Sequence, residues 1–127
     1  MSFAARILPL SALLAAPFCT LAQAADYEIG PNLVCNTQEQ VERFVALFTG
    51  DAQAAIRFVN DEEKNPTACG IVNVAYMRGA QVGMARHGEK AFEIVRILVV
   101  GVENENGIRP VRPAAFFTLF GVKEYAV

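Results

Sequence analysis

The 127-residue chain carries 11 basic side chains, 13 acidic side chains, one histidine and three cysteines. Its net charge of −2 excludes the strongly basic balance of a nucleic-acid-binding protein, so we expect no nucleic acid among its partners. The length allows one compact domain with a modest core.

The first 24 residues have the layout of a cleaved secretory signal peptide. Arg6 precedes an apolar run, and Ala22 and Ala24 occupy the positions of an A-x-A cleavage site. A membrane anchor is the alternative, but two prolines interrupt the run and it falls short of the roughly 20 residues that span a bilayer. We therefore expect a signal peptide over residues 1–24, a single domain over residues 25–127 with no membrane span, and a location in the periplasm or outside the cell.

The cysteines decide between a structural and a catalytic interpretation. Cys19 belongs to the leader, and a lipoprotein signal ending there is disfavoured because the bulky Phe18 precedes it. The remaining pair, Cys35 and Cys69, predicts one disulfide in an oxidising compartment. Such a bond would stabilise the fold by roughly 3–4 kcal/mol.

The catalytic alternative is a small thiol-dependent hydrolase or redox protein that uses Cys35 with His87. A helix N-terminus favours the thiolate of a nearby cysteine, and Cys35 lies just before a predicted helix. However, Cys-x-x-Cys and the common hydrolase, nucleotide-binding and metalloprotease motifs are absent from the sequence. We expect no catalytic residues, no cofactor and no metal, since two cysteines and one histidine are too few for a zinc site.

Residues 25–34 are predicted to be an exposed arm or a short edge strand, and two helices follow. Thr37 and Gln40 form the pattern of a capping box at the start of a first helix that ends at Gly50. Asp51 caps a second helix with apolar residues on one face. The polar stretch 60–70 is predicted to be a loop, and its three acids lack the ligand spacing of an EF-hand.

After Cys69 the hydrophobic period changes from helical to extended. The sequence predicts a strand over residues 70–77 and a short strand over residues 81–86, followed by a turn at residues 87–90. Residues 92–102 are apolar on both faces, as expected of a central strand.

Asn106 and Gly107 then favour a tight turn. A short edge piece over residues 108–111, broken by prolines, and a closing strand over residues 114–127 complete the chain. The predicted fold class is α+β: an N-terminal helical pair packed on a curled antiparallel sheet of about four or five strands, with one disulfide. Strand patterns alone do not say whether the sheet closes into a barrel.

The stretches CNTQEQVERFVALFTGD and PTACG, with the apolar FEIVRILVVGV after them, resemble a family of small uncharacterised exported proteins of Gram-negative bacteria. The resemblance implies an exported domain that stands alone. It implies no activity, because the family carries no catalytic motif.

Three arginines are the candidate binding residues. Residues 25–64 carry eight acidic and three basic side chains, whereas residues 65–127 carry five acidic and seven basic. Arg109 and Arg112 stand in a proline-stiffened segment, and Arg96 interrupts an apolar strand. Guanidinium groups held in this way suit a carboxylate or phosphate, although they also serve simply to solvate a sheet edge.

The leading hypothesis is therefore an exported, non-enzymatic binding or accessory domain. Its partner is expected to be another envelope protein or an anionic small ligand, held on the sheet side of the molecule. The sequence leaves the oligomeric state open, including a structural oligomer built by pairing of edge strands.

Overall fold

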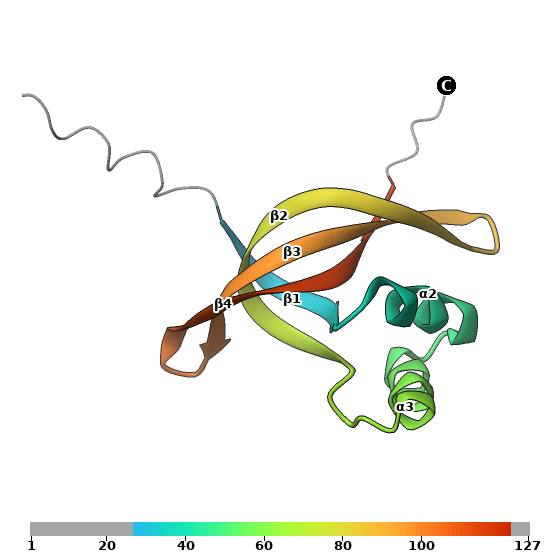
Figure 1. Cartoon of the computed structure of the whole chain (residues 1–127), viewed down its shortest axis with the longest axis horizontal. Coiled ribbons are helices and arrows are strands. Elements are labelled where there is room, and N and C mark those ends of the chain that lie inside the picture. Colours follow the sequence, from blue (N-terminus) through green and yellow to red (C-terminus); the bar gives the residue numbers. More distant parts are fainter. Residues whose placement is uncertain (1–26, 123–127) are drawn as a thin grey trace, which may run out of the picture.

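The computed structural model describes residues 27–122, which form four strands and two helices (Figure 1). In chain order these are β1 (Glu28–Cys35), α2 (Gln38–Leu47), α3 (Ala52–Glu63), β2 (Cys69–His87), β3 (Lys90–Asn104) and β4 (Gly107–Gly121). The predicted signal peptide and Cys19 lie outside the described residues. The predicted fold class, with helices packed on an antiparallel sheet and one disulfide, is confirmed.

The sheet is an antiparallel meander that closes on itself. Each strand pairs with the next along the chain, and β1 also meets β4 at Cys35 and Phe117, so the four strands form a small closed barrel. We predicted four or five strands, and the sheet has four. The long strands curl strongly around the interior (Figure 1).

The helical pair is an insertion between β1 and β2. We predicted the pair at the front of the domain, but β1 precedes it and pairs with β2 from Glu28 opposite Tyr76 to Cys35 opposite Cys69. The edge strand expected within residues 25–34 is therefore present. Its pairing fixes both ends of the helical insertion to one corner of the sheet.

β2 is one continuous bent strand, so the prediction of two separate strands in this region is wrong. Register shifts against β3 fall between Ala75 and Tyr76 and twice between Arg78 and Gly83, and such irregularities bend a strand without ending it. Gly79 permits the bend, because a Cβ atom at this position would lie 2.7 Å from the carbonyl oxygen of Arg96.

β4 is likewise continuous through Pro110 and Pro113, where we predicted a break. The register against β3 shifts between Val99 and Gly101, so the proline-containing segment bulges away from the ladder. The strand ends at Gly121, and the predicted continuation over residues 123–127 lies outside the described residues.

The helix caps follow the sequence closely. The Thr37 hydroxyl accepts from the Gln40 N–H at 3.2 Å while the Gln40 side chain accepts from the Thr37 N–H, which is the predicted capping box. Asp51 caps α3 as predicted. However, α3 continues to Glu63 and ends with Lys64 in the left-handed conformation, so the expected loop over residues 60–70 begins later than predicted.

Two apolar clusters lie on opposite faces of the sheet. Along β3, Ile94 packs with the helices, whereas Val95, Ile97 and Val99 face the interior of the curled sheet. Along β4, Phe117 joins the helical cluster, while Phe116 and Phe120 join the inner one. The alternation of successive side chains explains why β3 reads as apolar on both faces.

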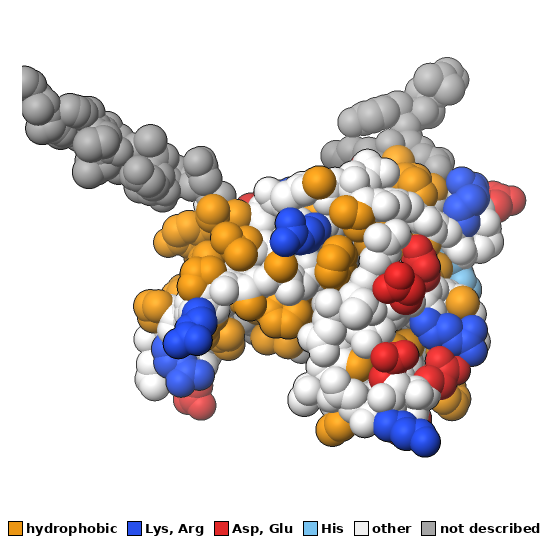
Figure 2. All heavy atoms as spheres, viewed as in Figure 1, with side chains coloured by type: hydrophobic (Ala, Val, Ile, Leu, Met, Phe, Trp, Pro, Cys, Tyr) orange, Lys and Arg blue, Asp and Glu red, His pale blue; other side chains and the backbone are white. Residues whose placement is uncertain are grey.

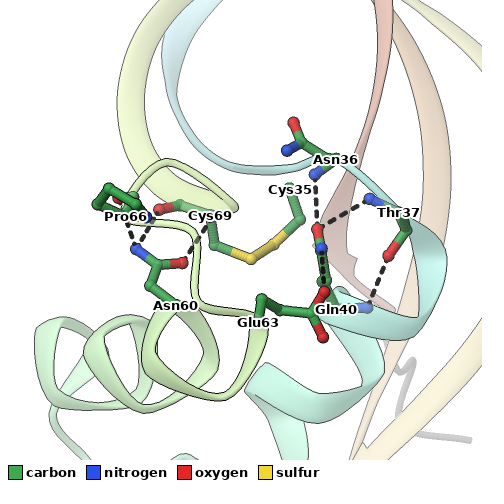
Figure 3. The surroundings of a disulfide bond; sticks show 8 residues. All are labelled: Cys35, Asn36, Thr37, Gln40, Asn60, Glu63, Pro66 and Cys69. Atoms are coloured by element: carbon green, nitrogen blue, oxygen red, sulfur yellow. Dashed lines mark hydrogen bonds between the residues drawn. A yellow bond between two sulfur atoms is a disulfide. The ribbon is translucent and has the colours of Figure 1, made fainter.

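A disulfide and two side-chain amides, one buried and one half-buried, close the neck of the helical insertion (Figure 3). Cys35 and Cys69 are bonded, with exposures of 0% and 3%. The Asn60 side chain accepts from the Cys69 N–H and donates to the carbonyls of Pro66 and Cys69. Gln40 donates to Glu63 at 3.0 Å, so the start of α2 is joined to the end of α3.

The disulfide generates a stability prediction. The bond closes a loop with a sequence separation of 34, so replacing both cysteines by Ala should lower the free energy of unfolding by roughly 3–4 kcal/mol. Urea unfolding followed by circular dichroism measures the change. Wild-type protein unfolded with and without a reductant is the control, and equal midpoints in the two conditions would contradict the prediction.

Candidate binding groove at the open end of the sheet

The interior of the curled sheet opens at one end into a groove of about 580 Å³. Its lining comes from all four strands and from the two connections to the helical insertion. It comprises Val34, Asn36, Pro66, Thr67, Cys69, Gly70, Val72, Val74, Val99, Val102 and Phe116. Five of these residues also belong to, or pack against, the inner apolar cluster. Figure 2 shows hydrophobic side chains gathered between the β3–β4 hairpin and the helical pair. Apolar pockets of this size, at the mouth of a barrel, are common ligand sites.

The other end of the interior is covered by a polar and aromatic cluster. Arg78 lies 3.7 Å from the centre of the Phe120 ring, and Tyr76 stacks on the same ring. Glu28 accepts hydrogen bonds from the Arg78 Nε at 2.8 Å and from the Tyr76 hydroxyl at 3.1 Å. These residues lie farther along β2 and β4 than the groove residues Val74 and Phe116.

The same cluster perturbs two titrations. Hydrogen bonds from Arg78 hold the pKa of Glu28 below its ordinary value, and the Tyr76 hydroxyl adds to this effect. Burial raises the pKa of Tyr76. The lowered pKa favours an ionised Glu28 carboxylate, and the raised pKa favours a neutral Tyr76 phenol. The carboxylate therefore lies between the Arg78 cation and the neutral phenol.

Thr118 places one unpaired hydroxyl inside the inner cluster. Its side chain is 0% exposed, and its Oγ1 atom has no hydrogen-bond partner among residues 27–122. A buried hydroxyl without a partner costs about 1–3 kcal/mol. Thr118 therefore lowers the stability of the wall between Phe116 and Phe120.

The structure places Arg109 opposite a residue that lines the groove. Arg109 lies opposite Val102 in the β3–β4 ladder, and residues directly opposite each other carry their side chains on the same face. Since Val102 lines the groove, the exposed Arg109 side chain starts from its rim. Arg112 lies three residues farther along β4, in the bulged segment, and is also exposed.

Arg96 does not join the other two arginines. It lies six residues along β3 from Val102, about 20 Å away in an extended strand, and lines a separate shallow pocket with Met77 and Leu98 on the outer face. Of the three arginines predicted from sequence, Arg109 therefore lies beside a groove residue, Arg112 lies farther along the same strand, and Arg96 lies on another surface.

Cys35 and His87 lie at opposite ends of α2. The Cys35 sulfur is bonded to Cys69, whereas His87 contacts the Phe48 ring with 5.4 Å between ring centres, at the C-terminal end of the helix. A ten-residue helix is about 15 Å long, so the imidazole is far from the sulfur. His87 instead borders a second, almost wholly apolar pocket of about 400 Å³ with Phe44 and Phe92.

The sequence did not reveal the groove itself. Its β2 valines, Val72 and Val74, lie at alternate positions, which predicts a buried face but not an accessible one. The Glu28–Arg78 pair was also missed, because its members are 50 residues apart in the sequence. The proline-flanked arginines lie on the β3–β4 hairpin, and their role in binding stays a prediction.

Within residues 27–122, no group of three or more potential ligands is placed to hold a metal ion, and neither helix is long and apolar enough to cross a membrane. Comparisons of the chain with protein-family models, with curated proteins and with solved structures find no match.

Thr118→Val should raise the free energy of unfolding by about 1 kcal/mol, because it removes the unpaired hydroxyl from an apolar site. Thermal and urea unfolding measure the effect. Thr67→Val is the matched control: the exposed Thr67 hydroxyl donates to Asn65, so this change should be neutral or slightly destabilising. A lower stability for Thr118→Val would show that the hydroxyl is satisfied in solution.

The lowered pKa of Glu28 predicts a pH-dependent contribution to stability. Because the folded pKa lies below the unfolded value of about 4.5, the contribution is present above that pH and is lost as the pH falls through the folded pKa. Glu28→Gln should therefore be less stable than wild type at pH 7, and the difference should shrink in acid. Urea midpoints at several pH values measure it, with Glu105→Gln in an exposed turn as control; a difference independent of pH would contradict the prediction.

Proposed function

We propose that this protein is an exported binding domain without catalytic activity, and that the groove at the open end of the sheet holds an anionic small ligand at Arg109. The observation that carries the proposal is the position of Arg109 opposite Val102, at the rim of an apolar groove. A charged group beside an accessible apolar surface offers both an anchor and a buried contact.

The charges of the hairpin support an anion as the ligand. In the described part of the chain the ion pairs are Arg43–Glu62 and Arg78–Glu28, and neither Arg109 nor Arg112 has a carboxylate within 4.0 Å. An exposed guanidinium without a protein partner is free to make two parallel hydrogen bonds to a carboxylate or phosphate.

Export is the cellular part of the proposal. It is supported by the leader-like layout of residues 1–24 and by the disulfide, which is compatible with an oxidising compartment such as the periplasm or the exterior of the cell. The resemblance to small exported proteins of Gram-negative bacteria points the same way. The catalytic alternative has no such support, because Cys35 is buried and bonded to Cys69.

A fluorescent anion with an apolar body, anilinonaphthalene sulfonate, tests the groove. Protein purified from cells that express the full chain should bind the dye saturably. Arg109→Ala should weaken binding about tenfold, because a charge-assisted hydrogen bond contributes about 1.5–3 kcal/mol. Arg112→Ala should have a smaller effect, since this residue lies farther from the groove lining.

Arg96→Ala is the matched control, because Arg96 is an exposed arginine of the same sheet on another surface. It should leave the dissociation constant unchanged. Equal affinities for the Arg109→Ala and Arg96→Ala proteins would reject Arg109 as the anion contact, and an absence of saturable binding would reject the groove.

A further inference from the structure

We infer that the ligand of the groove is an amphiphile of the fatty-acid type, with an unbranched hydrocarbon chain along the groove and a carboxylate at Arg109. This inference rests on the proposed function and adds the chemical class of the ligand. Three properties of the groove lead to it: its lining, its shape and the charges at its rim.

The lining selects a hydrocarbon. The walls are formed mainly by valines and by Phe116, and polar side chains enter only through Asn36 and Thr67 on the side of the helical insertion. The hydroxyl groups of a sugar placed against these valines would lose their hydrogen bonds to water without replacement, and each loss is unfavourable. A methylene chain makes no such demand.

The shape selects an elongated molecule. The β2 residues of the wall run from Cys69 to Val74, a length of about 17 Å in an extended strand, and Val99, Val102 and Phe116 form the facing wall. The stacked Tyr76 and Phe120 rings cover the interior beyond Val74. A linear molecule whose tail points toward these rings keeps its head group near Arg109.

A peptide fits this surface less well than a hydrocarbon chain. An extended peptide binds a sheet by pairing its backbone with a free strand edge. In the described chain β1 meets β4 only at Cys35 and Phe117, and the free edges that remain contain Pro31, Pro110 and Pro113, which have no N–H to donate.

The rim favours a single negative charge. Arg109 and Arg112 share the β3–β4 hairpin with Glu103 and Glu105, so the hairpin has no net charge from these four residues. Figure 2 shows basic side chains beside an acidic one on this hairpin, at the left of the view. One carboxylate can pair with Arg109, whereas a multiply charged group would also be repelled by the acids.

The test is displacement of anilinonaphthalene sulfonate by hexanoate, octanoate and decanoate, each below its micelle concentration. Each added methylene should tighten binding about two- to fourfold, since it buries more apolar surface. Arg109→Ala should weaken all three acids by a similar factor and leave the dependence on chain length intact. Affinities that do not change with chain length would overturn the inference.

Gly70 provides a variant that blocks the groove. It lines the groove, and a Cβ atom there would meet only Val72 Cγ2, at an ordinary distance of 3.8 Å. Gly70→Leu should therefore fold, occupy the groove and weaken decanoate at least tenfold, whereas Gly70→Ala should change its affinity less than threefold. Decanoate binding that survives in a folded Gly70→Leu protein would overturn the inference; if that variant does not fold, the chain-length series on the wild type decides.

Sedimentation with phosphatidylglycerol vesicles distinguishes a free fatty acid from a lipid held in a membrane. We expect the protein to remain in the supernatant, and co-sedimentation that Arg109→Ala abolishes would overturn the inference in favour of membrane docking. If the dye binds through Arg109 but the acids do not displace it, the ligand class is wrong and the proposed function stands. If the dye does not bind, both fail.

Discussion

The pairing of Cys35 with Cys69 is the constraint on which the architecture depends. These residues are opposite each other in the β1–β2 ladder, and Cys35 is also the residue through which β1 meets β4. One position therefore closes the sheet and holds both ends of the helical insertion. A covalent bond here compensates for the small core of a domain of this size, because it restricts the unfolded chain.

The two faces of the sheet have different roles as a result. Fixed at this corner, the helices cover the face that carries Ile94 and Phe117, and they leave the end of the interior beside Val102 uncovered. Arg78 and Glu28 cover the far end with a pair whose side chains are both 48% exposed. The interior is therefore an apolar space with charged groups at both ends. At one end Arg78 is paired with Glu28, and at the other end Arg109 has no carboxylate partner within residues 27–122.

Local signals in the sequence predicted local structure well. The Thr37 capping box, the Asp51 cap and the turn at Gly107 depend on a few neighbouring residues, and each is present. The disulfide was predicted because Cys35 and Cys69 are the two cysteines outside the predicted signal peptide. The continuity of β2 was not predicted, because the sequence does not show that Gly79 lies against the Arg96 backbone, where the strand bends without ending.

Long-range features could not be predicted. The closure of the sheet requires Cys35 to meet Phe117, which are far apart in the sequence, and no periodicity encodes that contact. Arg109 and Arg112 were identified by the neighbouring prolines, and Arg96 because it interrupts an apolar strand. Only the register of β4 against β3 shows that Arg109 lies beside the groove and Arg96 does not.

The geometry of the neck has a consequence for the sheet. The Cα atoms of Cys35 and Cys69 are 4.1 Å apart, so the chain leaves the sheet and returns to it at almost the same point. The length of the helical insertion is therefore independent of the register of the strands. Its apolar side chains are not, because they pack with Ile94 on one face of the sheet.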